Sequence, residues 1–566
     1  MSDEAIPAEE AARGWRKLFP PAAWLPSYRA GWLPHDAIAG VTLAAYAVPV
    51  ALAYASLAGL PPERGLYGYV IGGVCYALFG TSRQLAIGPT SAISMLVGTT
   101  VAGMAQGDAV RWGEIAALSA VVFGAMSILA WLLRLSALVS FISETILLGF
   151  KAGAAFTIAM TQLPKLFGVK GGGEHFLERT WTLLHQLGDM NLAVLAFGLV
   201  AIALLALGQK ALPGKPVALA VVAASIAVLT MTSLQEHGFK VVGELPSGLP
   251  QVSAPALRPS EVDGIVPLAF ACFLLAYIES VSAARTLAER RGYEIDPRQE
   301  LLALGAANVG VAFGQGFPVA GGLSQSSVND KAGAKTPLAL VFASAAIAAC
   351  LFFTGLVRNL PNVVLAAIVL VAVSGLVDVP SMVRLRRSSR FEFRIAMAAF
   401  VGVLLLGILK GVVLAAILSL LMLIARAARP HVAFLGRIPG TDRYSGLERS
   451  PDNEEIAGAI LFRVEAGILY FNADHVRDTV WRRIRAAASP PKLVVGDLSM
   501  SAYVDVSGAR MLARLHSDLA AAGIQLRLVE AHGYVRDLLR AEGLEDRVGD
   551  LDRRTSLDDV VRAIRA

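Results

Sequence analysis

Long apolar runs follow one another almost without a break from Asp36 to Arg429. Many approach the roughly 20 residues that a helix needs to cross the hydrocarbon core of a bilayer, although several are short or interrupted by glycine and proline. The pattern predicts about fourteen membrane-spanning helices. They are expected near 36–57, 65–80, 88–105, 113–133, 136–162, 190–208, 216–233, 264–284, 300–316, 322–334, 337–357, 362–378, 392–408 and 411–427.

The pattern changes after Arg429. Residues 430–452 are rich in proline, glycine and charge, and we expect a linker there. From 453 to 566 short apolar segments alternate with amphipathic ones. Segment 456–471 predicts two strands, and 492–499 and 524–531 one strand each, whereas 474–488, 503–523 and 533–544 predict helices. Strands alternating with helices over 453–566 indicate a small α/β domain.

Composition agrees with a membrane protein. Of the 566 residues, 55% are hydrophobic and only 17% charged, and the mean hydropathy is +0.59. A soluble chain carries about a quarter of charged residues. The net charge of +6 is modest and does not call for a nucleic-acid partner. The three cysteines lie in apolar runs without pairing or metal spacing, so we expect no disulfide, metal site or cofactor.

The distribution of Lys and Arg predicts the orientation of the spans. With the N-terminus inside, cytoplasmic segments carry about twice as many basic residues as external ones, as the positive-inside rule requires. An even number of spans then places both termini in the cytoplasm. We expect the protein to lie in the inner membrane of the cell. Residues 1–35 show no removable signal peptide. We expect a cytoplasmic segment there, with tryptophans at the headgroup level.

Two small, hydroxyl-rich helix starts stand out in this apolar region. LAIGPTSAIS begins at Leu85, and VAGGLSQSSVN begins at Val319, an odd number of spans later. This spacing predicts an inverted repeat in which two half-helices meet near the membrane midplane. Their N-termini would present free N–H groups and partial positive charge to an anion. The predicted site residues at these starts are Thr90, Ser91, Ala92, Leu323, Ser324 and Gln325. The alternative is that both segments are ordinary helix kinks.

A few polar side chains interrupt the apolar spans. Glu279 is expected to face the substrate cavity, because a buried charge is costly unless it has a task or a partner. We assign it to substrate binding and to coupling with a proton, since burial favours a neutral carboxyl group. The alternative is a structural ion pair with Lys151. Tyr54 and Gln162 are candidate cavity residues, or else helix-packing residues.

The motifs now in view resemble those of the sulfate permease (SulP) family, relatives of eukaryotic anion exchangers. The matching segments are 36–68, AIGPTSAIS at 86–94, 149–169, 278–309, GGLSQSSVNDKAGAKTPLA at 321–339 and DLSMSAYVDVSGARML at 497–512. The resemblance implies an α-helical membrane protein with about 14 spans in a 7+7 inverted repeat, divided into core and gate. It also implies a homodimer and a cytosolic STAS domain related to anti-sigma-factor antagonists.

Compared with the pattern of this family, several positions of the chain are informative. Where many relatives carry Gln or Glu after the first-span proline this chain has Val50, and where they often carry Arg in the tenth span it has Gln325. Ala283 stands where sodium-coupled relatives carry Thr, which disfavours sodium. Ser507 corresponds to a serine that is phosphorylated in the anti-sigma antagonists. The alternative is that Ser507 is simply the N-cap of a helix.

These observations predict a secondary active transporter of a small anion, with an elevator-type movement and possible proton coupling. Sulfate is the first choice of substrate, followed by bicarbonate and C4-dicarboxylates. The alternatives are an anion channel and a membrane sensor with the STAS domain as its output. We find no motif for covalent chemistry and expect no enzyme. The expected partners are the anion, the lipid bilayer, a second copy of the chain and a cytosolic regulator at the STAS domain.

Overall fold

The computed structural model describes residues 18–136, 143–173, 175–212, 215–232, 234, 237–548, 551 and 554–565. The chain divides into two compact units, Met1–Ser419 and Leu420–Ala566. Expectations for residues 1–17, and for the part of one predicted span at 137–142, lie outside the described residues.

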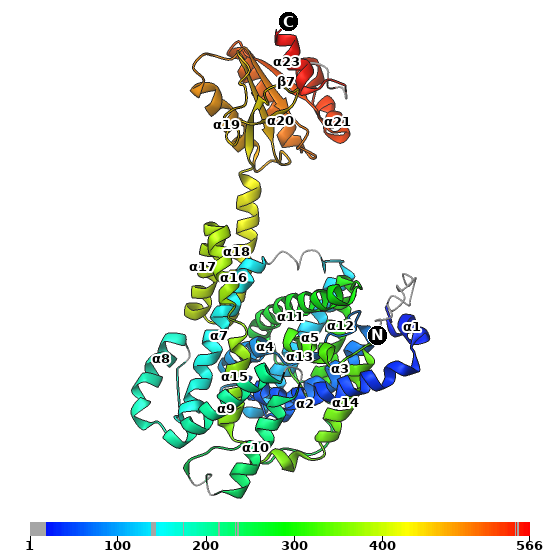
Figure 1. Ribbon diagram of the computed structural model, residues 1–566, viewed down its shortest axis with the longest axis vertical. Helices are drawn as coiled ribbons and strands as arrows, with labels where there is room; N and C mark the ends of the chain where they lie inside the picture. Colours follow the sequence, from blue (N-terminus) through cyan, green and yellow to red (C-terminus); the bar gives the residue numbers. More distant parts are fainter. Residues whose placement is uncertain are drawn as a thin grey trace. The chain divides into compact units, whose positions relative to one another are not determined.

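The first unit is built of helices (Figure 1). Its main helices are α1 (Pro21–Trp24), α2 (Leu33–Leu57), α3 (Glu63–Phe79), α4 (Ser91–Ala105), α5 (Ala109–Leu132), α7 (Glu144–Phe167), α8 (Phe176–His185), α9 (Leu192–Ala211), α10 (Val217–Met231), α11 (Val262–Arg291), α12 (Pro297–Phe313), α13 (Leu323–Lys331), α14 (Leu338–Cys350), α15 (Asn362–Ser374), α16 (Val379–Ser388), α17 (Arg390–Leu406) and α18 (Ile408–Ala428).

Each predicted span coincides with one of these helices. Within the described residues, seven helical segments are long and apolar enough to cross a membrane. They contain α2, α5, α7, α9, α11, α15 with α16, and α18. The helices α4, α10 and α14 are apolar but shorter. The chain is therefore a multi-span helical membrane protein. The sequence analysis missed α8 and α16, because both are amphipathic and too short to stand out as apolar runs.

Local sequence explains where these helices begin and approach one another. Asp296 caps α12 by accepting bonds from the backbone N–H groups of Arg298 and Gln299. Gly149 of α7 allows close packing on α17, because a Cβ at this position would lie only 1.9 Å from the carbonyl oxygen of Ala396. Such glycines let helix backbones come together in a membrane, where packing replaces the hydrophobic driving force.

A two-stranded ladder lies at the centre of this unit. Strand β1 (Ile87–Gly88) pairs antiparallel with β2 (Ala320–Gly321). The side chain of Asn308 on α12 holds the approach to β2, since its Nδ2 donates to the Val319 carbonyl at 3.1 Å and its Oδ1 accepts from the Val319 N–H at 2.9 Å. The ladder thereby joins the segments that lead into α4 and α13.

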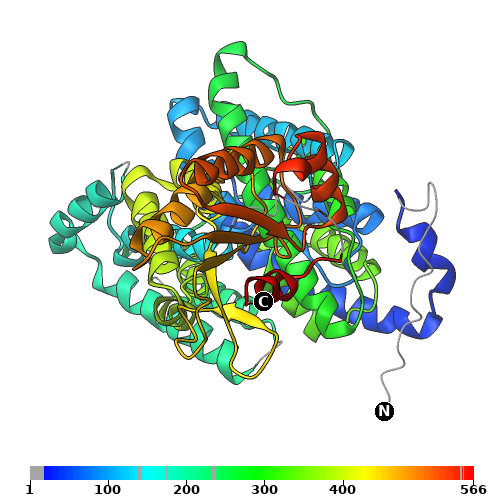
Figure 2. The same ribbon diagram turned by 90° about the horizontal axis from the view of Figure 1, so that it is seen from above.

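The second unit contains a five-stranded sheet in the order β4-β3-β5-β6-β7. Figure 2 shows this sheet and its helices in colours from yellow to red. Its elements are β3 (Val432–Arg437), β4 (Tyr444–Gly446), β5 (Ala459–Val464), α19 (Ala473–Ala486), β6 (Leu493–Asp497), α20 (Val506–Ala521), β7 (Gln525–Val529), α21 (Gly533–Ala541), α22 (Glu545–Val548) and α23 (Leu557–Arg565). The strands β5, β6 and β7 run parallel, as the alternating pattern predicted.

Two expectations for this unit were wrong. Segment 430–452 is no linker, because β3 and β4 lie in it and β3 pairs antiparallel with β5. Segment 456–471 forms one strand, β5; its second apolar stretch makes only an isolated bridge between Ile468 and Val504. The helix α20 begins with Asp505 as its N-cap, whose side chain accepts from the Gly508 N–H at 2.7 Å. Ser507 is therefore not the N-cap, and it is exposed in the first turn.

Candidate functional site

The starts of α4 and α13 lie side by side, because the strands that precede them pair directly. The first backbone hydrogen bonds are those from the Ser94 N–H to Thr90 at 2.9 Å and from the Ser326 N–H to Gly322 at 3.0 Å. The N–H groups earlier in each first turn have no intrahelical acceptor. Each helix start also carries about half a positive charge. Together these features can bind an anion through the backbone.

Hydroxyl groups surround the start of α4. The Tyr54 side chain is in hydrogen-bond contact with Ser91. Thr90 and Ser94 are buried, and their hydroxyl oxygens have no partner within the described residues. An unpaired buried hydroxyl costs about 1–3 kcal/mol. The protein therefore leaves donors at this helix start that its own groups do not use, and such donors are suited to a polar ligand.

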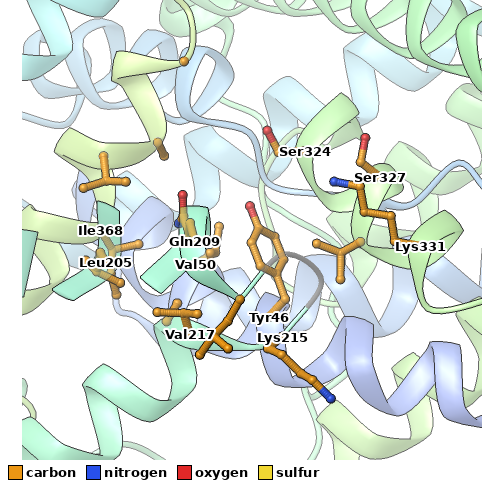
Figure 3. A pocket seen from close by; sticks show the side chains of 16 residues that line it. Tyr46, Val50, Leu205, Gln209, Lys215, Val217, Ser324, Ser327, Lys331 and Ile368 are labelled. Atoms are coloured by element: carbon orange, nitrogen blue, oxygen red, sulfur yellow. The ribbon is translucent and has the colours of Figure 1, made fainter. Parts of the chain in front are cut away.

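A cavity of about 340 Å³ opens beside the start of α13 (Figure 3). The residues that line it come from α2, α9, the start of α10, α13 and α15. They are Tyr46, Val50, Leu205, Gln209, Leu212, Lys215, Val217, Ala218, Ser324, Ser327, Val328, Lys331, Ile368, Val371, Ala372 and Gly375. None of these described residues is acidic, so the charged side chains in the wall favour an anion.

One face of α13 supplies the polar wall of this cavity. Ser324, Ser327 and Lys331 have the spacing of a single helix face. In Figure 3 the amino group of Lys331 lies beside Ser327, whereas that of Lys215 points away from the other labelled side chains. Neither lysine was among the predicted site residues. The structure places them in the cavity wall.

Gln325 differs from its expected role. Its side chain is only 3% exposed and is not among the cavity residues. The amide nitrogen donates to the carbonyls of Ala86 at 2.8 Å and Ala320 at 3.2 Å. The amide oxygen accepts from the Tyr69 hydroxyl. Gln325 thus ties β2 and the residue before β1 to α3, and its side chain does not line the cavity.

The other predicted site residues occupy different surroundings. Ser324 lines the cavity, whereas Ala92 is buried and Leu323 is 50% exposed. Glu279 is half-buried and makes no hydrogen bond or ion pair with the described residues. Its charge interacts with Lys151 and with Tyr54. The helix starts, Tyr54 and Glu279 are therefore brought together in one region of the unit.

Sequence reasoning missed several residues of the cavity wall. Tyr46 lies one helical turn before Val50 on α2, and Ser327 lies one turn after Ser324 on α13. These i, i+4 and i, i+3 spacings were visible in the sequence and could have identified both residues. Gln209 on α9 had no such signal, since it stands alone after a long apolar run.

Comparison with known proteins covers both units. A family model described as the sulfate permease family matches residues 33–399, and a STAS domain model matches residues 450–559. A probable sulfate transporter of Mycobacterium tuberculosis is 31% identical over 551 residues, which cover 96% of this chain and 98% of that protein. A low affinity sulfate transporter of Stylosanthes hamata is 29% identical, with 94% of this chain and 88% of that protein covered.

Solved structures show the same fold. The structure of the murine Solute Carrier 26 family member A9 anion transporter in the inward-facing state matches with a TM-score of 0.88 and 23% identity, covering 100% of this chain and 97% of that chain. The transmembrane domain of a cyanobacterium bicarbonate transporter matches with a TM-score of 0.60 and 22% identity, covering 69% of this chain and 98% of that chain.

Proposed function

This chain belongs to the sulfate permease family and is an anion transporter rather than an enzyme, and on that premise we propose secondary active transport of a small anion. Sulfate is the first candidate, because the relatives that align over nearly the whole chain are named sulfate transporters. Bicarbonate and C4-dicarboxylates follow. The observation that carries the proposal is the pair of adjoining helix starts beside a cavity whose lining contains lysine but no acid.

The anion in this proposal rests between the starts of α4 and α13. Backbone N–H groups and the hydroxyls of Ser91 and Ser324 donate to it, and Lys331 lies on the route from the cavity. This arrangement requires no arginine at position 325. Mostly apolar side chains from α9, α10 and α15 face these polar groups, with Gln209 and Lys215 as the polar residues on that side.

The movement that we propose is of the elevator type. About fourteen spans in a 7+7 inverted repeat would divide into a core that carries the two helix starts and a gate that includes α9, α10 and α15. The protein would lie in the inner membrane as a homodimer with both termini in the cytoplasm. A cytosolic regulator would act on the STAS domain, with exposed Ser507 as the position for a phosphoryl group.

Coupling to protons is assigned to Glu279. Its carboxylate would share a region with the bound anion and repel it when charged. Anion and proton would then favour each other's binding, because binding linkage is reciprocal. Transport would follow the proton gradient, and sodium would have little effect.

The test is uptake of radiolabelled sulfate, bicarbonate and succinate into proteoliposomes that contain the full chain, with and without proton and sodium gradients. We expect saturable sulfate uptake that responds to the proton gradient. Ser324→Leu, which fills the mouth of the site, should abolish this uptake while the protein stays folded. Flux that does not saturate would favour a channel. No uptake of any anion in a folded protein would contradict the proposal.

A truncation separates transport from sensing. It should remove residues from 430 onward, because β3 begins at Val432 and a later cut would leave part of a sheet. Retained uptake in the truncated protein would assign transport to the membrane unit. Loss of uptake with correct folding would make the STAS domain a required part of the transporter.

A further inference from the structure

A second and larger cavity lies elsewhere in the membrane unit. It has a volume of about 620 Å³ and is lined by residues from the end of α2, from α4, from the start of α5 and from the second half of α7. The segment around the start of α8 and the turn between α17 and α18 complete the lining. By chain order this is the face on which α2, α4 and α7 end, opposite to the end at which α13 finishes. The orientation of the spans makes it the outer face.

The lining contains two lysines, one arginine and one histidine. Lys165 lies near the end of α7, Lys410 follows the turn at Gly407, and Arg179 and His175 come from the segment around the start of α8. No Asp or Glu occurs among the described residues of the lining. Lys165 and Lys410 make no hydrogen bond or ion pair with other described residues. Their charges are therefore available to a ligand.

Several neutral polar groups of this cavity already donate to the protein's own carbonyl groups. The Thr161 hydroxyl donates to the Ile158 carbonyl at 2.7 Å, and the Thr99 hydroxyl donates to Met95 at 2.9 Å. The indole N–H of Trp112 likewise donates to a backbone carbonyl at 3.0 Å. An anion needs donors, and the two lysines supply charged N–H groups that make no hydrogen bond or ion pair with the described residues. This differs from the helix starts, where backbone N–H groups and hydroxyls are available.

The two cavities are separate places along the same helices. On α2, Val50 lines the inner cavity and Ser56 the outer one. All residues between them, Ala51–Ala55, are buried, and six residues of helix span about 9 Å. On α4 the outer lining begins at Met95, four residues or about 6 Å from the helix start at Ser91. The two linings share no residue, and neither Ser91 nor Ser324 belongs to the outer one.

We propose that the outer cavity is a second anion-binding site, in which Lys165 and Lys410 hold a small oxyanion of the sulfate class before it reaches the helix starts. Clefts lined by one sign of charge raise the local concentration of the oppositely charged substrate. The site would load the transporter from outside. This role deepens the proposed transport function and rests on it, but the binding itself can be measured without transport.

A protection experiment on the wild-type protein tests binding directly. The purified full chain is briefly acetylated with a water-soluble reagent that reacts with amines. The reaction is run once with sulfate and once with a bulky organic anion, at the same ionic strength. Mass spectrometry then gives the rate of acetylation at Lys165 and at Lys410. Lys170 is the internal reference, because it is exposed and close in sequence but does not line the cavity. Sulfate should slow acetylation of the two cavity lysines at least threefold more than that of Lys170. Equal slowing at all three would overturn the proposal.

The variant Ser324→Leu separates this site from the transport site. In Ser324→Leu, which blocks only the helix starts, sulfate should still protect Lys165. Loss of that protection would mean a single shared site and would overturn the proposal. If the wild-type protein shows protection but transports no anion, the proposed function fails and the second site stands.

A transport assay compares variants in which one lysine is replaced by glutamine. Lys165→Gln should raise the external KM for sulfate on the order of three- to tenfold, with the maximal rate within about twofold of the wild type. Lys170→Gln removes the same charge five residues away and should leave KM unchanged. A KM that is unchanged in Lys165→Gln and in Lys410→Gln, or one that rises equally in Lys170→Gln, would contradict the loading role.

Discussion

Replacing Gln325 by leucine tests whether its side chain stabilises the fold or binds the substrate. Leucine keeps much of the side-chain volume but removes every polar atom. The carbonyl groups of Ala86 and Ala320 and the hydroxyl of Tyr69 then lose the partner that Gln325 provides. These groups come from the residue before β1, from β2 and from α3, so one substitution weakens the contact between the segments that lead into α4 and α13.

The expected loss of stability follows from the number of groups left unpaired. A buried polar group without a partner costs about 1–3 kcal/mol. The ladder carbonyls keep their second lone pairs, which lowers the cost at each, so we expect a total of about 3 kcal/mol. This is a large fraction of the roughly 5–15 kcal/mol that stabilises a typical folded protein. Gln325→Leu should therefore melt at a clearly lower temperature than the wild type.

Thermal unfolding of the detergent-purified protein, followed by tryptophan fluorescence, measures this effect, and sulfate binding is measured in parallel. Ser324→Ala is the matched control, because Ser324 is adjacent but lines the cavity. It should weaken binding and leave the melting temperature near that of the wild type. A Gln325→Leu protein that melts like the wild type but no longer binds sulfate would refute the structural role and show that Gln325 binds the substrate.

Three further predictions concern other parts of the chain. Glu279→Gln should flatten the rise of uptake that we expect as external pH falls, and an unaltered pH profile in uptake assays would exclude Glu279 from coupling. Asp505→Ala removes the N-cap of α20 and should destabilise the second unit by about 1 kcal/mol; calorimetry of the full chain showing no shift in that unit's transition would contradict this. Gly149→Ala should cost about 1–3 kcal/mol by overpacking on α17, whereas Gly103→Ala, with open space around it, should cost less in the same melting assay.

The sequence predicted the helices well because each apolar run carries its own signal. A span needs about 20 apolar residues in a row, and this condition does not depend on distant parts of the chain. The two helix starts could also be predicted, since Pro89 and Gly322 mark a break next to small hydroxyl residues. The pairing of β1 with β2 shows that these distant breaks meet.

Side-chain direction could not be predicted in the same way. Gln325 follows Ser324 directly, but a helix turns about 100° per residue, so neighbours face different surroundings. The hydroxyl that Gln325 accepts from belongs to Tyr69, 256 positions away in the sequence. The error at 430–452 has a similar origin. Prolines at 430 and 439 hid β3, which is a strand only because β5 lies beside it.

The two cavities also give a scale for the proposed elevator movement. The helix α2 contributes to both linings, and the buried residues from Ala51 to Ala55 separate them by about 9 Å along the helix axis. To pass an anion between the cavities, the helix starts have to shift by a similar distance, or between one and two turns, relative to α7, α9 and α15. Small residues on α2 make such a shift feasible, because four of these six positions from Val50 to Ala55 are occupied by alanine or valine, whose short side chains interlock less with a neighbouring helix. Leu52 and Tyr54 are the two larger side chains, and Tyr54 interacts with Ser91 at the start of α4.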